Sequence, residues 1–569
     1  MEIDKKLVKL LRNISILLQI KGENIFKAQA YAKAADIIES MQLDIHTLAK
    51  NGKLGEIEGF GEALVKKITE YVETGRMSYY DRLSSEVPVE LVSITKIPGI
   101  GPKKTKILFE SLGIKSIDDL ERACIEDKVS KIKGFSIKSQ EIILNSIQHI
   151  KAWKGKRQQF ACFQEANNIS NFLKSIPEVQ RYSIVGEMRR YSETVTSVHF
   201  LASTIETQKL ISNFGKRFNL NIEANSFAFQ TDDEILVRIS FCHPRSYIWQ
   251  LHNLTGSGDY IKSFSEFFEN KTNRSFDFYE FPYPTITFET EEQLFDWLGI
   301  QYIPPELRES NFSIQQAIEQ RIPRLIQESD LRGMVHVHST WSDGFNTIEQ
   351  MATAAKNLGF EYIVVCDHSQ SAKYANGLEP ERVILQHKEI DELNKKNIGI
   401  RILKGIESDI LPDGSLDYNE DILQKFDVVV ASVHSHFKMT KAEMTRRIIY
   451  ALMSPYTHIL GHPTGRLLLS RDGYEVDIKA IIDVAADYGK IIELNANPYR
   501  LDLPWEHVIY AKEKGVKISI NPDSHDIGSL TDVFYGVNFA RKGWLEKSDV
   551  VNCLNCDAFL QHIDSIGNK

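Results

Sequence analysis

The chain has 569 residues, 42% of them hydrophobic and 25% charged, which indicates about two to four folded domains and excludes a disordered or fibrous protein. Its six cysteines are scattered and no apolar run is long enough for a membrane span or a signal peptide, so we expect a cytoplasmic protein without disulfides or a membrane partner. The net charge of −9 is uneven, because residues 1–157 hold 27 basic against 21 acidic residues, so affinity for nucleic acid is expected only of this front part.

Residues 1–90 and 91–157 are predicted to form an N-terminal helical domain and a second helical region, because apolar residues recur at three- and four-residue steps. One pattern, apolar residues followed by a glycine turn and a helix, occurs in "EIEGFGEALVKKI" and "ITKIPGIGPKKTKI"; "SKIKGFSIKSQEII" is a weaker copy with Ser136 replacing the second glycine. Such a turn exposes N–H groups at a helix N-terminus, where phosphate is favoured, although a plain helix packing unit has the same pattern. The predicted DNA contacts are Gly59, Gly61, Gly99, Gly101, Lys103 and Lys104.

Residues 158–318 form a predicted mixed α/β region, in which strand-like runs such as "TSVHFLAS" and "EILVRISFC" alternate with helical stretches. The segments "GEMRRYSETVTSVHFLAS" and "LTGSGDYI" resemble parts of a family X DNA polymerase, and the glycine repeats resemble helix-hairpin-helix motifs, which bind the DNA backbone without reading sequence. The resemblance implies a fingers-like region at residues 91–157, a palm at residues 158–255 and a thumb-like region at residues 256–318. It also makes Lys67 a candidate for Schiff-base lyase chemistry on abasic sugars, beside the commoner role of a solvent-facing lysine.

The catalytic carboxylates of that family are missing from the matching positions. The family holds two divalent ions with three aspartates, where this chain has Ser197, His199 and Ser240, and Glu187 replaces a serine that helps to hold the triphosphate. Two hydroxyls and one imidazole cannot hold such a pair of ions, so the resemblance implies a degenerate polymerase site. An alternative alignment would use the acidic residues 232–234, which have the pattern of a solvated turn.

From about residue 331 the pattern changes to strands that alternate with helices, as in "MVHVH", "YIVVCDH", "VVVASVH", "HILGH", "IIELNA" and "KISINPDSH", which predicts a parallel β/α barrel. This part holds 11 of the 16 histidines. A lone histidine at a strand end is commonly structural, but several metal-ligand residues at the strand ends of one barrel indicate a metal site. In "HVH" the two imidazoles are expected on one side of a strand. The predicted metal ligands are His336, His338, Asp343, His368, Glu407, His434, His462, Asp523 and His525.

These motifs resemble the polymerase and histidinol phosphatase (PHP) domain over residues 331–569. The resemblance implies a distorted seven-stranded β/α barrel with three metal ions, manganese or zinc with iron as a further candidate, that hydrolyses phosphoesters. It assigns one ion to the catalytic residues His336, His338, Glu407 and Asp523, makes Glu407 a bridge to a second ion with His434, and leaves the other four ligands to complete the centre. The chain departs from the family at Met334, which replaces an acidic residue and is expected to affect the surroundings of His336.

The whole chain is therefore predicted to be a multidomain DNA-binding phosphoesterase. A 3′-to-5′ exonuclease or 3′-end processing activity on gapped or damaged DNA, sequence-independent and alongside other repair enzymes, fits all three regions. Two alternatives stay open. A small-molecule phosphatase of the histidinol phosphatase type would use the same barrel, and a DNA-end binding scaffold would fit the degenerate palm but leaves the histidine cluster unexplained.

Overall fold

The computed structural model describes residues 5–40 and 44–566. It divides into two compact units, residues 1–155 with 232–234 and residues 156–231 with 235–569. The two ends of the chain, residues 1–4 and 567–569, lie outside the described residues, as do the corresponding ends of the first and last predicted domains. Within the described ranges, no helix combines the length and the apolar character needed to cross a bilayer.

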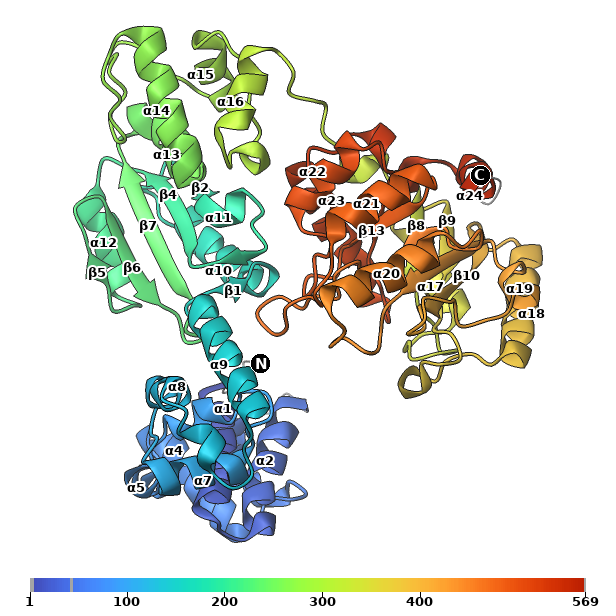
Figure 1. Ribbon diagram of the computed structural model, residues 1–569. Helices are drawn as coiled ribbons and strands as arrows, with labels where there is room; N and C mark the ends of the chain where they lie inside the picture. Colours follow the sequence, from blue (N-terminus) through green and yellow to red (C-terminus); the bar gives the residue numbers. More distant parts are fainter. Residues whose placement is uncertain (1–4, 41–43, 567–569) are drawn as a thin grey trace. The chain divides into compact units, whose positions relative to one another are not determined.

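The first unit is helical (Figure 1). Its helices bury one shared apolar core, to which α1 contributes Leu11, Ile14 and Leu18, residues spaced to lie on one helical face. The helices are α1 (Lys5–Lys21), α2 (Ile25–Ser40), α3 (Ile45–Lys50), α4 (Glu62–Thr74), α5 (Ser78–Glu86), α6 (Leu91–Ile94), α7 (Pro102–Leu112), α8 (Ile117–Ile125) and α9 (Ile137–Trp153).

The three sequence repeats of this unit form the same turn. In each, a buried apolar residue donates its backbone N–H to the carbonyl three residues earlier: Phe60 to Ile57, Ile100 to Ile97, and Phe135 to Ile132. The glycine before each donor has a φ between 80° and 96°, a conformation that favours glycine. The repeat thus reflects a real structural unit that ends at the start of α4, α7 and α9.

The second unit begins with a five-stranded sheet, the predicted palm. The order is β2 (Arg181–Val185), β4 (Val198–Ser203), β7 (Leu236–Cys242), β6 (Ser226–Gln230) and β5 (Asn221–Ile222), and only the β4–β7 pair is parallel. Helices α13 (Tyr247–Thr255), α14 (Gly258–Thr272), α15 (Glu291–Trp297) and α16 (Asn311–Ile318) follow and share an aromatic-rich core around Trp249 and Phe264. The acidic residues 232–234 are exposed and lie between β6 and β7, as a solvated turn would.

The rest of the second unit is a parallel seven-stranded barrel. Each strand pairs with the next along the chain, and a bridge between Val337 and Ser524 brings the first strand to the last, so the barrel is nearly closed. Six of its strands are buried throughout and β10 is buried except at Arg401 and Lys404, as is typical of parallel sheets covered on both faces. They are β8 (Gly333–Val337), β9 (Tyr362–Val365), β10 (Arg401–Asp409), β11 (Val428–Ser432), β12 (Ile459–Leu460), β13 (Ile491–Asn495) and β14 (Ile518–Asn521).

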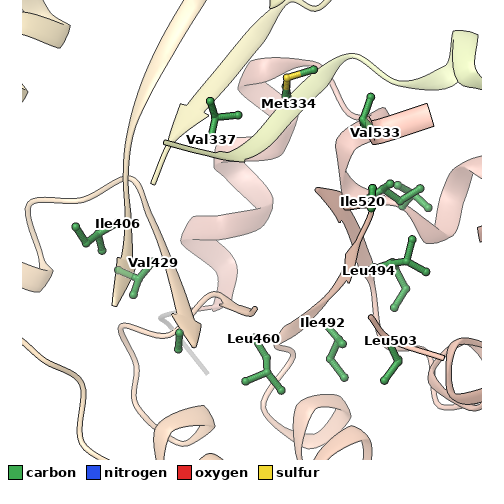
Figure 2. Packing of buried hydrophobic residues seen from close by; sticks show 14 of the residues in the cluster. Met334, Val337, Ile406, Val429, Leu460, Ile492, Leu494, Leu503, Ile520 and Val533 are labelled. Carbon is green, nitrogen blue, oxygen red and sulfur yellow. The ribbon is translucent and has the colours of Figure 1, made fainter. Parts of the chain in front are cut away.

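Helices cover the outer face of the barrel strands and form its main apolar core. Figure 2 shows part of this core, with Met334 and Val337 of β8 and Ile520 of β14 among the labelled side chains. The covering helices are α17 (Ile348–Asn357), α18 (Pro380–Lys396), α20 (Lys441–Leu452), α21 (Ile478–Asp487), α22 (Trp505–Glu513) and α23 (Val533–Lys542). Met334 is fully buried in this core, and its effect on the surroundings of His336 stays a prediction.

Candidate metal centre

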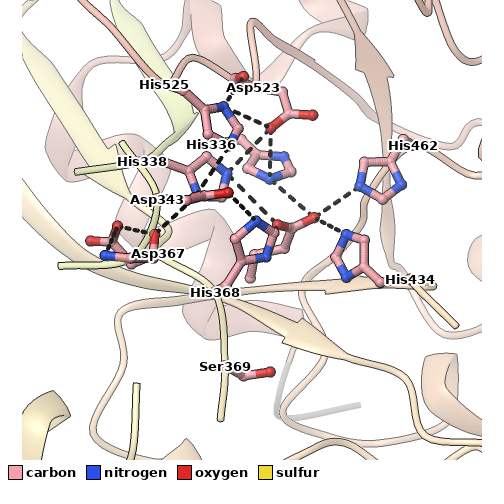
Figure 3. A network of polar contacts seen from close by, with 12 residues as sticks. His336, His338, Asp343, Asp367, His368, Ser369, His434, His462, Asp523 and His525 are labelled. Carbon is pink, nitrogen blue, oxygen red and sulfur yellow. Dashed lines mark hydrogen bonds and ion pairs between the residues drawn. The ribbon is translucent and has the colours of Figure 1, made fainter. Parts of the chain in front are cut away.

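The predicted ligands come together where the barrel strands end. His336 lies in β8, Glu407 in β10, and Asp523 just after β14, while the other six follow the ends of their strands. Figure 3 shows these side chains pointing toward one another from separate strand ends. The nine side chains therefore share one site, although their distance along the chain reaches 189 residues between His336 and His525.

The backbone at this rim departs from regular strand geometry. His336 has a φ of 63° and Asp523 a φ of 53°, in the left-handed region that non-glycine residues rarely adopt. The pairing of β8 with β9 also shifts register between Met334 and Val337. The rings of His336 and His338 converge to 5.3 Å between centroids, as predicted, but a local irregularity contributes to this and not strand alternation alone.

Glu407 lies at the centre of the cluster and is fully buried. Its Oε1 is 3.3 Å from His336 Nε2, 3.2 Å from His434 Nε2 and 2.9 Å from His462 Nε2. Its Oε2 is 2.9 Å from His368 Nδ1 and 3.7 Å from His338 Nε2. One carboxylate thus faces five imidazoles, which is the arrangement expected of a residue that bridges ions.

A second group surrounds Asp343 on the more exposed side. The Asp343 carboxylate lies 3.4 Å from His525 Nε2, 3.6 Å from His368 Nε2 and 3.8 Å from His338 Nδ1. Asp523 Oδ1 approaches His338 Nε2 to 3.2 Å and so connects the two groups. The side-chain atoms form three overlapping sets, each small enough to surround one ion: His338, Asp343, His368 and His525; His336, His338 and Glu407; and His368, Glu407 and His434.

The donor atoms fit a metal ion better than they fit one another. Several buried atoms in the cluster make no hydrogen bond within the described part of the chain, a state that costs about 1–3 kcal/mol for each such group. Imidazole nitrogens and carboxylates are the ligands that Zn²⁺, Mn²⁺ and Fe²⁺ accept. The atoms that make no hydrogen bond within the described residues are His336 Nε2, His338 Nδ1 and Nε2, His368 Nδ1, Glu407 Oε2 and His462 Nδ1.

Buried acidic residues orient the imidazoles from behind. Glu493 Oε2 accepts from His336 Nδ1 at 2.6 Å, and Asp409 Oδ1 from His434 Nδ1 at 2.5 Å. These bonds leave the Nε2 atom of each ring facing Glu407. Partners of this kind fix the tautomer of a metal-binding histidine and raise its basicity. Asp409 was not identified from the sequence, although it lies two residues after Glu407 on the same strand face.

Neighbouring carboxylates shift the pKa values of two histidines in the cluster. Burial lowers the pKa of His434, but Glu407 and Asp409 outweigh burial and raise it to about 10. Burial likewise lowers the pKa of His525, and Asp343 together with Asp523 raises it to about 9. In the absence of a cation these imidazoles therefore hold protons that balance the carboxylates.

Two of the palm positions predicted to be degenerate, His199 and Ser240, hydrogen-bond each other. His199 Nε2 lies 2.9 Å from Ser240 Oγ, and burial, with a contribution from Arg238, lowers the pKa of His199 to about 4. Ser197 precedes β4. Glu187 accepts hydrogen bonds from the backbone N–H and the hydroxyl of Thr196, at 2.6 and 2.8 Å.

The two arginines of the "GEMRR" segment are also engaged internally. Arg189 donates to Glu291 at 2.5 Å and to the hydroxyl of Thr255 at 2.6 Å. Arg190, which is buried, donates to the Thr255 carbonyl at 2.7 Å and to Glu309. These side chains thus connect the palm to the helices that follow it.

The glycine turns place the candidate DNA-contacting residues at helix starts. Gly61 and Gly101 are the residues before α4 and α7 and have no side chain to cap them, whereas Ser136 caps α9 with its own hydroxyl. The third repeat therefore satisfies a helix N–H with its own side chain, as Gly61 and Gly101 cannot, and phosphate contact at the first two repeats stays a prediction. Lys103 is exposed, and Lys104 Nζ donates to the carbonyl of Gly99, the glycine in the same turn.

Lys67 lies on α4 of the first unit. Its Nζ lies 4.8 Å from the centre of the Tyr79 ring and donates to the Ala63 carbonyl. Burial lowers its pKa, and the nearby cations Lys27 and Arg82 lower it further. A lowered pKa is what an amine nucleophile needs, so Lys67 keeps its place as a lyase candidate.

Comparison with known proteins accounts for these three regions. Four family models match: a helix-hairpin-helix domain at residues 4–77, a SAM-like helix-hairpin-helix tandem at 91–148, a DNA polymerase beta thumb at 250–309 and a PHP domain at 335–497. The DNA polymerase/3′-5′ exonuclease PolX of Bacillus subtilis is 35% identical over 98% of this chain and 100% of its own length. The chain belongs to the PolX family.

The PolX family combines family X polymerase modules with a PHP domain, so the predicted family and fold class are confirmed. A PolX-type chain with these domains binds DNA and is a phosphoesterase. Probable phosphatases of Caldanaerobacter subterraneus subsp. tengcongensis and Thermoanaerobacter sp. are 30% and 31% identical over 35% of this chain, and cover 78% and 81% of their own lengths. The predicted domain boundaries and the roles of individual residues stay predictions.

Proposed function

We propose that this PolX-type chain is a metal-dependent 3′-to-5′ exonuclease that trims gapped or damaged DNA, and that its palm no longer transfers nucleotides. The observation that carries the proposal is the cluster around Glu407, where five imidazoles face one buried carboxylate and several donor atoms have no other partner. The B. subtilis relative is named as a DNA polymerase and 3′-5′ exonuclease, which supports the direction of cleavage.

The residues of the barrel rim would hold the ions and the substrate phosphate. His336, His338 and Glu407 would hold one ion, and the sets around Asp343 and His434 would hold two more, with Mn²⁺ the best match to the mixed ligands. Bound divalent ions supply activation of a water nucleophile and neutralisation of charge on the phosphate. Asp523 joins two of the three sets, so its loss is expected to affect the whole centre.

The palm would act as a binding module only. Its three matching positions offer no carboxylate, and His199 and Ser240 already satisfy each other by a hydrogen bond. Glu187 places a negative charge where the family's triphosphate would lie, and like charges at short range repel strongly in a poorly solvated site. The glycine turns of the first unit would hold the duplex beside the break by its phosphates.

A single assay tests both the exonuclease activity and the loss of nucleotide transfer. Purified protein would be incubated with gapped DNA that carries a labelled primer strand, with Mn²⁺, and with or without deoxynucleotides. We expect Mn²⁺-dependent shortening of the primer and no extension. Asp523→Ala is expected to lose at least about 100-fold in rate and to bind less Mn²⁺, whereas Asp557→Ala, an exposed aspartate on the last helix, should behave as wild type.

Each part can fail separately. Extension of the primer would show that the palm is active. Absence of any Mn²⁺-dependent cleavage would contradict the exonuclease. Hydrolysis of small phosphomonoesters at a far higher rate than DNA would favour the phosphatase alternative, which the likeness of the barrel to probable phosphatases suggests.

A further inference from the structure

A pocket of about 330 Å³ opens beside the metal centre and has no part in the ligand cluster. Its size is at the lower end of the range for small-molecule sites. It is lined by apolar, aromatic, amide and basic side chains, among them Leu467, Leu468, Asn497, Tyr499, Arg500 and Gln158. The first five belong to barrel loops, and Gln158 belongs to the strand that opens the palm, β1 (Arg157–Gln158).

Arg500 connects this pocket to the metal centre. Its Nε lies 3.7 Å from Asp523 Oδ2, and 22% of its side chain is exposed. The pocket is therefore one side chain away from the predicted ligands, and the cation at their boundary could contact a phosphate held between the two sites.

Tyr499 supplies an accessible aromatic ring on an ordered loop. Its backbone N–H donates to Asn497 Oδ1 at 3.0 Å, and its carbonyl accepts from the Leu468 N–H at 2.7 Å. Phe160 of the palm makes an edge contact with the ring at 4.7 Å between centroids. Tyr499 as a whole residue nevertheless remains 54% exposed. An exposed aromatic beside an arginine is the combination with which proteins stack the bases of single strands.

The palm closes one side of the pocket. Gln158 Nε2 donates to the Leu468 carbonyl at 2.9 Å, and Glu193 pairs with Arg466 at 2.9 Å. Arg466 is held by this ion pair and by its hydrogen bond to the Arg500 carbonyl. The polymerase module thus contributes a wall to a pocket of the barrel.

We propose that this pocket binds the 3′-terminal nucleotide of the DNA, with its base stacked on Tyr499 and Arg500 directed at the phosphate beside the metal centre. The leucines would contact the base or sugar, and the amides of Gln158 and Asn497 would offer hydrogen bonds to a base edge. The inference rests on the proposed exonuclease function and specifies its substrate subsite. It gives the degenerate palm a role in exonuclease specificity.

The test varies the ring and the base together. Single-turnover cleavage of the terminal nucleotide is measured on 5′-labelled single strands with Mn²⁺, where the last nucleotide is either thymidine or a stable abasic analogue. Wild type is expected to prefer the base by roughly tenfold or more, the range for one base–aromatic stack. Tyr499→Ala should lose this preference and Tyr499→Phe should keep it. Tyr450→Ala, an exposed tyrosine of α20 away from the pocket, is the matched control.

Hydrolysis of bis(p-nitrophenyl) phosphate, which has no base, separates the two hypotheses. If wild type cleaves neither this diester nor DNA, the proposed function fails and the subsite with it. If wild type cleaves DNA but Tyr499→Ala retains the preference for a terminal base, or wild type shows no such preference, the subsite is overturned while the exonuclease stands. A loss of preference in Tyr499→Ala with a smaller effect on the diester supports the subsite.

Discussion

Replacing Glu493 by glutamine should weaken metal binding without removing any predicted ligand. Glu493 is fully buried and accepts four hydrogen bonds, from His336 Nδ1 at 2.6 Å, Asn521 Nδ2 at 2.7 Å, Asn495 Nδ2 at 2.8 Å and the His462 N–H at 3.0 Å. Glutamine has the same shape but no charge. It can still orient the His336 ring, but it no longer increases the electron density at Nε2.

The expected loss of metal affinity can be estimated from the bond between Glu493 and His336. At 2.6 Å and an effective dielectric constant of about 20, a full positive charge on His336 would interact with Glu493 by about 6 kcal/mol. Only part of this interaction energy is lost in Glu493→Gln, because the charge of the ion is shared among several ligands and the glutamine oxygen still accepts a hydrogen bond. Loss of such an orienting carboxylate weakens metal binding by about 10- to 100-fold, or about 1.4–2.7 kcal/mol.

The measurement is titration with Mn²⁺ at pH 7.5, following free ion by electron paramagnetic resonance. Asp502→Asn serves as the control, because Asp502 is an equally buried carboxylate whose partners are Thr464 and Gly465 and include no imidazole. Its Mn²⁺ affinity should stay within about threefold of wild type. An unchanged affinity in folded Glu493→Gln protein would mean that His336 is not a metal ligand held by this carboxylate, and the assignment of the first ion would be wrong.

Further predictions concern the pH dependence of metal binding, the pH dependence of stability and the stability of a palm-to-thumb ion pair. His434 and His525 have folded pKa values raised to about 10 and about 9 and must lose their protons to bind a metal, so Mn²⁺ binding at pH 8 should release protons into a weakly buffered solution and the apparent affinity should rise with pH. In metal-free protein the raised pKa of His434 stabilises the fold fully below about pH 6.5 and this contribution disappears as the pH rises through about 10. Glu291→Gln should destabilise the second unit by about 3–5 kcal/mol, because the buried Glu291 carboxylate forms ion pairs with Arg308 and Arg189. The control is Glu289→Gln, whose side chain is 81% exposed. A melting temperature of Glu291→Gln no lower than that of this control would contradict the prediction.

The architecture was largely predictable because each region has a strong local signal. Glycine turns before amphipathic helices predicted the three hairpins, and apolar runs followed by histidines predicted six barrel strands. The strand β10 was not predicted as a strand, since Lys404, Gly405 and Glu407 interrupt its apolar pattern. A side chain at Gly405 would lie 2.6 Å from the Val365 carbonyl, so glycine is required there by close packing that no local pattern reveals.

The candidate ligands were found because their residue types recur at strand ends, and topology then brings these ends together. Their grouping was less predictable. The sequence left His462 among four ligands without an assigned ion, and its Nε2 lies 2.9 Å from Glu407 Oε1. Which ligands are neighbours depends on strand order and on the positive φ values at the rim, and neither follows from spacing along the chain.

The seam of the barrel has a consequence for how the protein is assembled. The first and last strands are joined by the bridge between Val337 and Ser524 and a bond from the His338 N–H to the Ser524 carbonyl. His336 and His338 stand on one side of this seam and Asp523 on the other, with 3.2 Å between His338 Nε2 and Asp523 Oδ1. A cation shared by these side chains would hold the two sides of the seam together, so that binding of the ion would stabilise the closed barrel.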